Sequence, residues 1–236
     1  MTKTRKPKSI TESGKKPARF RLLLAALLSA LAMGLGYAVL SLPSQAPGLS
    51  DPVAANLESS GVSNPVTAVL LNFRGYDTLL ELGVLLLALL GVWSLGAVPK
   101  RRESSPGLVL DMLSRLLVPL LILVAGYLLW LGAHAPGGAF QAGSVLATAG
   151  VLSLLTGWRP DTRFSGLPLR ITLVAGLGVF VVVAIVLIPM GGRLLAYPPS
   201  FAGALILLIE AAATLSIGVT LAALFLGGRP ETGGHR

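Results

Sequence analysis

The sequence has 236 residues, of which 53% are hydrophobic and only 12% are charged, and its mean hydropathy is +0.78. A soluble domain carries about a quarter charged residues, so this composition excludes a single compact soluble domain and indicates an integral membrane protein. The absence of cysteine excludes disulfides, iron–sulfur ligation and thiolate zinc sites. With two histidines, His134 and His235, we expect neither a metal centre nor a cofactor.

Six apolar runs are long enough to cross a bilayer, which takes about 20 mostly apolar residues. They cover residues 22–42, 79–98, 113–133, 139–158, 171–190 and 201–226. Apolar residues occupy all faces of these runs, as helices embedded in lipid require. The first run exceeds the roughly 7–15 apolar residues of a signal peptide, so we interpret it as an uncleaved anchor. The sequence therefore predicts an all-α integral membrane protein with about six transmembrane helices.

The basic residues alternate between the two sides of this predicted topology. Eight of the 19 Lys and Arg lie within the first 21 residues, and most of the others lie in the loops after the second and fourth runs and in the C-terminal tail. By the positive-inside rule, both termini are predicted to be cytoplasmic. Topology explains the net charge of +9, and no nucleic-acid partner is expected. We expect residues 1–20 to form a disordered basic tail.

The stretch of residues 43–63 mixes Pro, Ser, Gly and Asn and is predicted to be an outer loop. Immediately after it, Asn64 and Pro65 are suited to start a helix, as the cap and the first helical residue. The apolar run that follows, residues 66–73, is too short to cross a bilayer. We expect it to lie at the outer interface or to insert partway.

Ionisable groups inside a span are expensive and mark functional sites by default. Glu210 lies nine residues into the last run, which is about 14 Å at the helical rise. It predicts a proton or cation relay, with a neutral carboxyl that only packs as the alternative. Arg74, Asp77 and Glu81 share one helix side by their spacing. Arg74 and Asp77 favour an ion-paired helix start, whereas Glu81 lies deeper among apolar residues and favours function.

The connection between the third and fourth runs is a further candidate. His134 can titrate near neutral pH, which suits the outer mouth of a proton path, although an interfacial anchor is the alternative. Pro136, Gly137 and Gly138 predict a tight turn into the fourth run. Gly143 belongs to a face of small residues on that run, which predicts close packing against another helix. At the other end of the third run, Asp111 and Arg115 have the spacing of an i,i+4 ion pair.

Two stretches resemble a known family. Residues 72–82, NFRGYDTLLEL, resemble the F-R-G-F-D-T-L-G-E motif in the C-terminal region of the large subunit of Mrp/Mnh-type multisubunit sodium/proton antiporters. The same module occurs as a small subunit of membrane-bound hydrogenases. Residues 113–160 resemble the B subunit of these antiporters, and RLLVPLLILVAGYLLWLGAHAPGGAF carries the likeness. The resemblance implies a two-helix module at residues 21–101, similar to that region of the large subunit, followed by a four-helix module at residues 102–236, similar to the B subunit.

The resemblance implies a membrane subunit that contributes to ion and proton translocation and to assembly of the complex. It carries the transport role of the motif's acidic residue onto Glu81, with Arg74, Asp77 and His134 as further motif members. The implied partners are other membrane subunits, the lipid bilayer, and the transported cation and proton, in the cytoplasmic membrane of a prokaryote. The sequence departs from the family pattern at Asn72, Tyr76, Leu80 and Gln141.

Two other functions stay open at this point. One is a membrane-arm subunit of a hydrogenase-like or complex I-related redox-coupled ion pump, because that class shares the first module. The other is a structural scaffold without an ion path. The sequence contains no Ser/His/Asp arrangement, H-E-x-x-H or nucleotide-binding motif. We therefore expect a transporter subunit rather than an enzyme.

Overall fold

The computed structural model describes residues 18–42, 48–96, 107–157, 166–191 and 195–227, and every regular element in these ranges is helical. The chain divides into two compact units, Met1–Gly48 and Leu49–Arg236. The first contains α1 (Ala18–Leu40), which is apolar along its length and exposed on its described faces. Three predicted segments lie outside the described residues: residues 1–17 of the basic tail, residues 97–106 at the boundary between the two predicted modules, and residues 228–236 of the C-terminal tail.

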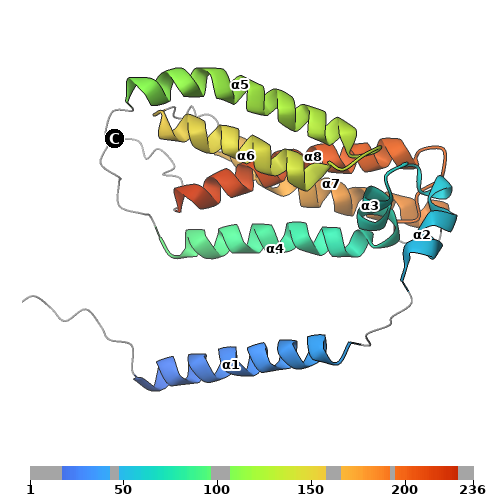
Figure 1. The fold of residues 1–236 in the computed structure, drawn as a ribbon, viewed down its shortest axis with the longest axis horizontal. Coiled ribbons are helices and arrows are strands. Elements are labelled where there is room, and N and C mark those ends of the chain that lie inside the picture. The colour runs from blue at the N-terminus through green and yellow to red at the C-terminus, as the bar shows by residue number, and fades with distance from the viewer. Residues whose placement is uncertain (1–17, 43–47, 97–106, 158–165, 192–194, 228–236) are drawn as a thin grey trace, which may run out of the picture. The chain divides into compact units, whose positions relative to one another are not determined.

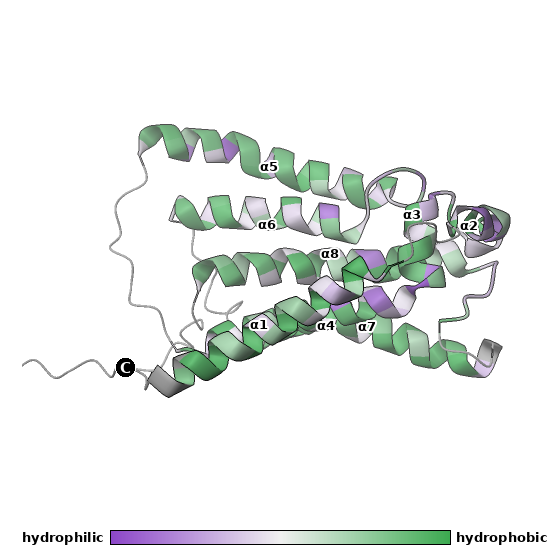
Figure 2. Ribbon diagram, turned by 60° about the horizontal axis from the view of Figure 1, so that its bottom comes forward, coloured by the Kyte–Doolittle hydropathy of each residue, from purple (hydrophilic) through white to green (hydrophobic). Residues whose placement is uncertain are grey.

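The second unit contains the remaining helices (Figure 1). They are α2 (Ser50–Asn56), η1 (Glu58–Ser60), α3 (Pro65–Ala68), η2 (Val69–Phe73), α4 (Gly75–Ser94), α5 (Leu108–Leu131), α6 (Ala139–Leu155), α7 (Leu167–Gly191) and α8 (Ala202–Leu226). The ribbons of the long helices α5, α7 and α8 are mostly green on the hydropathy scale of Figure 2. Among the described residues, α1, α4, α5, α7 and α8 are long and apolar enough to cross a membrane, whereas α6 is shorter, with 17 residues. The prediction of an all-helical membrane protein is confirmed.

The core of the second unit is centred on α8, which packs against α4, α6 and α7. Half of the membrane-span window of α8 is buried, compared with 11% for α5 at the edge of the bundle. Close approach of α6 depends on Gly143, because a Cβ there would lie 2.8 Å from the Cβ of Ile217 on α8. Ala139 and Ala147 are buried on the same face of α6. The small-residue face predicted for this span therefore packs against α8 of the same chain.

A discontinuous helix leads into α4. Asn64 caps α3 by accepting the Val66 N–H, and Pro65 is the first helical residue, as predicted. The π-helical turn η2 follows and ends at Phe73, and the N–H of the next residue, Arg74, donates to the Val69 carbonyl at 2.7 Å. Thr78, in the first turn of α4, donates its hydroxyl to the Leu70 carbonyl across the break. Residues 66–73, predicted to lie at the outer interface or to insert partway, are partly buried, with Ala68 and Leu71 in the core.

Candidate functional site

Glu210 occupies a buried position on α8, eight residues after the helix begins at Ala202, and its exposed fraction is 3%. Its carboxylate accepts a hydrogen bond from the backbone N–H of Ala139, the first residue of α6. The first N–H groups of a helix lack partners within the helix and carry partial positive charge. Glu210 therefore caps α6 from a different helix. The second carboxylate oxygen, Oε2, is buried and has no hydrogen-bond partner among the described residues.

Two glycines make room for this carboxylate. A Cβ on Gly138 would lie 2.7 Å from Oε1 of Glu210, and a Cβ on Gly132 would lie 3.3 Å from the same atom. Gly138 also has φ of +102°, a conformation that other residues rarely adopt. Gly137 is tightly placed as well, since its Cβ would lie 2.5 Å from the Leu128 carbonyl oxygen. The turn predicted from Pro136, Gly137 and Gly138 is thus shaped to receive Glu210, which the sequence pattern does not reveal.

The start of α3 holds this turn in place. The side-chain amide of Asn64, which is 4% exposed, donates to the carbonyl oxygens of Ala135 at 2.8 Å and Gly132 at 3.1 Å. The hydroxyl of Thr67 donates to the Gly132 carbonyl at 2.5 Å, and the backbone N–H of Asn64 donates to Ala133 at 3.1 Å. We call Asn64 and Thr67 the clamp. The sequence indicates the helix cap at Asn64 but not these bonds to residues about 70 positions later.

Arg74, Asp77 and Glu81 lie on the other side of the helix break, apart from this cluster. Arg74 and Asp77 form an ion pair with an N–O distance of 2.5 Å, so the ion-paired helix start is present. Glu81 is exposed on α4. The Glu81 side chain forms no hydrogen bond or ion pair with the described residues. The structure therefore separates the two carboxylates that the sequence selects, one in the interior of the chain and the other on its surface.

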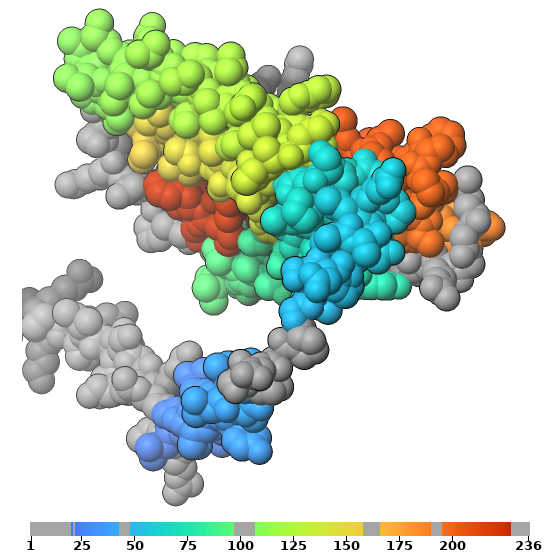
Figure 3. All heavy atoms as spheres, turned by 45° about the vertical axis from the view of Figure 1, so that its right-hand side comes forward, coloured from blue at the N-terminus to red at the C-terminus, as the bar shows by residue number. Residues whose placement is uncertain are grey.

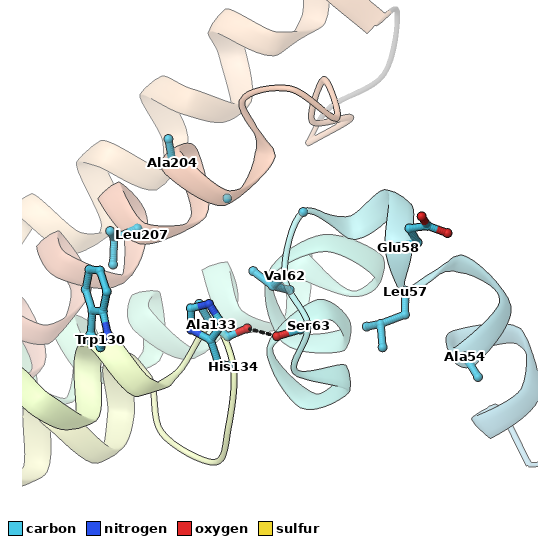
Figure 4. A pocket seen from close by; sticks show the side chains of 12 residues that line it. Ala54, Leu57, Glu58, Val62, Ser63, Trp130, Ala133, His134, Ala204 and Leu207 are labelled. Carbon is cyan, nitrogen blue, oxygen red and sulfur yellow. Dashed lines mark hydrogen bonds between the residues drawn. The ribbon is translucent and has the colours of Figure 1, made fainter.

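His134 is exposed at the rim of a cavity of about 900 Å³ beside the turn. The cavity lies among η1, the end of α5 and the start of α8, and Figure 4 shows the side chains that line it. They include Glu58, Ser63, Trp130, His134, Ala204 and Leu207. Figure 3 shows the cyan segment containing α2 and α3 against this end of the bundle.

A second cavity, of about 990 Å³, lies near the other end of α5. It is lined by residues of α5, α6 and α8, and mostly by apolar and small side chains. At its edge, Arg115 and Asp111 form the predicted i,i+4 ion pair, at 3.0 Å, with both side chains exposed to solvent in part.

The C-terminal half of the chain, which contains Glu210 and the glycine turn, matches a known protein family. Residues 109–228 match the family described as a domain related to the MnhB subunit of Na⁺/H⁺ antiporters. The chain belongs to this MnhB-related family. The matched residues lie within the four-helix module predicted at residues 102–236. A comparison with curated protein sequences gives no match.

Two solved structures share the fold of the MnhB-related chain. One is a chain of the Mrp complex from Dietzia sp. DQ12-45-1b, with a TM-score of 0.60 and 25% identity over 97% of this chain and 28% of that chain. The other belongs to the membrane-bound sulfane sulfur reductase, an archaeal respiratory membrane complex, with a TM-score of 0.62 and 24% identity over 88% of this chain and 97% of that chain.

The family match and the Mrp similarity make the chain a multi-pass membrane subunit of the multisubunit sodium/proton antiporter type. The predicted resemblance to Mrp/Mnh-type subunits is confirmed.

Proposed function

We propose that this chain helps a multisubunit antiporter exchange a monovalent cation, sodium, for protons, and that Glu210 binds the proton within this chain. The observation that carries the proposal is the buried carboxylate of Glu210, bonded through one oxygen to the N-terminus of α6 and unpartnered at Oε2. The Ala139 N–H and the helix dipole stabilise the ionised form. The unpartnered Oε2 is the atom that would take up a proton.

Glu81 has a different part in this proposal. It is exposed on α4, a helix long and apolar enough to span the membrane. A carboxylate that faced lipid would be costly, and intramembrane charges almost always face other protein or a wet cavity. A neighbouring membrane subunit would therefore cover Glu81 and share its ion. The chain would sit in the cytoplasmic membrane of a prokaryote with both termini in the cytoplasm, as the positive-inside pattern predicts.

The test is to replace each carboxylate with its amide, Glu210→Gln and Glu81→Gln, in the assembled complex. Sodium-dependent proton movement is then measured in everted vesicles with a pH-sensitive fluorescent dye. We expect each change to lower the rate at least about tenfold, equivalent to roughly 1.4 kcal/mol. Asp51→Asn, at an exposed carboxylate in the first turn of α2, is the matched control and should transport normally. Normal transport by Glu210→Gln in an intact complex would contradict the proton-binding role.

The similarity to a chain of an archaeal respiratory complex favours a second candidate, a membrane subunit of a redox-coupled ion pump. The two candidates differ in their partners. Purifying the tagged chain in mild detergent and identifying its partners by mass spectrometry separates them. Redox subunits would support the second candidate, and antiporter subunits alone would support the first.

The scaffold interpretation makes a different prediction from both. If the carboxylates only pack, Glu81→Gln should reduce the amount of assembled complex in proportion to the loss of transport. Transport per assembled complex, obtained by quantifying the partner subunits in the same vesicles, should then equal that of the unaltered protein.

A further inference from the structure

Two walls of the cavity beside the α5–α6 turn lie close to Glu210 along the chain, although Glu210 itself does not line the cavity. On α8, Ala204 and Leu207 line it. Residues three apart lie on one helix side, so Glu210 is the next residue inward from Leu207 on that side. At the helical rise of about 1.5 Å per residue, Glu210 lies about 4.5 Å beyond Leu207 and about 9 Å beyond Ala204.

The wall formed by α5 ends at the same carboxylate. Trp130, Ala133 and His134 line the cavity. Gly132, between them in the sequence, approaches the carboxylate so closely that a Cβ would lie 3.3 Å from Oε1 of Glu210. Gly132 therefore connects the residues of this wall to the surroundings of the carboxylate. Figure 4 shows Trp130 and Leu207 next to each other on the two walls.

We propose that this cavity is an aqueous vestibule through which protons from the predicted outer side reach Glu210. This inference rests on the proposed function of Glu210 and adds the route by which its proton arrives. The polar groups at the rim, Glu58, Ser63 and His134, attract water, and a volume of about 900 Å³ holds many water molecules. Leu207, three residues before Glu210 on α8, lies about one helical turn from the carboxylate.

The chemistry of the lining favours a proton over a bare metal cation. Among the described lining residues, Glu58 is the one carboxylate. Apart from Glu58, Ser63 and His134, the lining residues are glycine or have apolar side chains. The described residues contain no cluster of three or more His, Cys, Asp or Glu that could hold a metal ion. A proton needs only water and one acceptor, and the buried Oε2 of Glu210 is an unpartnered acceptor.

Because the sequence has no cysteine, a single introduced thiol reports on one position without background from this chain. The variants are Leu207→Cys and Ala204→Cys on the vestibule wall. The matched control is Leu208→Cys, which follows Leu207 directly, is 51% exposed and does not line the cavity. Each is made in the tagged full-length chain within its complex, in intact cells, and treated with a charged, membrane-impermeant maleimide. Labelling of the purified chain is then measured by mass spectrometry.

We expect Leu207→Cys and Ala204→Cys to be labelled at least tenfold faster than Leu208→Cys, from the outer side. Equal and slow labelling of all three, in complexes that assemble normally, would overturn the vestibule and show that lipid or a partner protein fills the cavity. Ala204→Cys, with a smaller change in side chain, keeps the test available if Leu207→Cys fails to assemble.

Labelling does not depend on transport, so the two proposals fail in different ways. If Glu210→Gln transports normally while Leu207→Cys is labelled rapidly, the vestibule is supported and the proton-binding role of Glu210 is contradicted. If Glu210→Gln abolishes transport and the wall stays unlabelled, Glu210 receives its proton by another route. If both the vestibule and the proton-binding role of Glu210 are correct, attaching the bulky label at Leu207→Cys should inhibit transport, and attaching it at Leu208→Cys should not.

Discussion

The two membrane carboxylates of this chain have opposite surroundings. Glu210 is almost fully buried, bonded to the first N–H of α6 and surrounded by a turn whose glycines fit its shape. Glu81 lies on an exposed side of α4, near an ion-paired helix start and without a bonded partner among the described residues. A charged group in a membrane needs a partner. The chain supplies that partner for Glu210, whereas for Glu81 we propose that another protein of the complex supplies it.

The largest effect should come from filling the space next to Glu210. Gly138→Ala places a Cβ 2.7 Å from Oε1 and forces φ of +102° on a non-glycine residue. Backbone strain alone costs about 1–2 kcal/mol, and displacing the carboxylate adds to it. We expect a thermal unfolding midpoint several degrees lower for the purified complex. Gly83→Ala, on α4 two residues from Glu81, meets nothing within 4 Å and should be neutral or stabilising. Equal shifts of the unfolding midpoint for Gly138→Ala and Gly83→Ala would contradict the difference in surroundings between Glu210 and Glu81.

The clamp gives the next largest effect. Asn64→Ala leaves the Ala135 carbonyl without the side-chain donor seen in the structure and weakens the hold on Gly132. Losing the partner of a buried polar group costs about 1–3 kcal/mol. We expect lower thermal stability, together with slower transport because the turn no longer fixes the N–H that faces Glu210.

The matched control for the clamp is Asn72→Ala. Its side-chain amide makes one bond, to the Ser60 carbonyl, and does not touch the turn. A loss of stability is expected there too, of about 1 kcal/mol. Transport per assembled complex should fall for Asn64→Ala and stay unchanged for Asn72→Ala. A fall in transport for Asn72→Ala but not for Asn64→Ala would show that the turn held by Asn64 does not affect proton binding at Glu210.

A third prediction concerns Glu81, whose contribution should be to assembly rather than to the fold of this chain. Glu81→Leu changes an exposed side chain, so the thermal stability of the chain itself should shift by less than about 0.5 kcal/mol. Retention of partner subunits through a detergent wash should fall, because the partner's polar group loses its carboxylate. Quantitative mass spectrometry of the washed complex measures this. Full retention would place Glu81 against lipid or water instead.

The smallest effects belong to the exposed ion pairs. Arg115→Gln removes the pair with Asp111, whose side chains are 78% and 37% exposed. Arg74→Gln removes the pair with Asp77, at 63% and 46% exposed. Exposed pairs contribute about 0–1 kcal/mol, so neither change should shift the unfolding midpoint by more than a degree or two. A larger effect at Arg74 than at Arg115, measured side by side, would show that a partner desolvates the Arg74–Asp77 pair.

The sequence predicts the positions of the spanning helices well, because length and apolar composition determine which runs can cross a bilayer. It also predicts features with local causes, such as the Asn64 cap and the two ion pairs. The exposed side of Glu81 could not be predicted, since apolar residues cover every face of α4 and no stripe marks the inner one. The bonds from Asn64 to the turn, and from Ala139 to Glu210, join residues about 70 positions apart. No local pattern encodes such pairings.

The shortness of α6 has an electrical consequence. Its 17 residues extend about 25 Å, compared with about 38 Å for the 25 residues of α8. If water fills the vestibule beside the α5–α6 turn, the membrane voltage falls mainly across the protein between that water and the far side. Moving a unit charge through the whole voltage involves about 2.3 kcal/mol per 100 mV. A proton would then reach Glu210 after crossing a small part of this drop, and the larger part would act on its onward step.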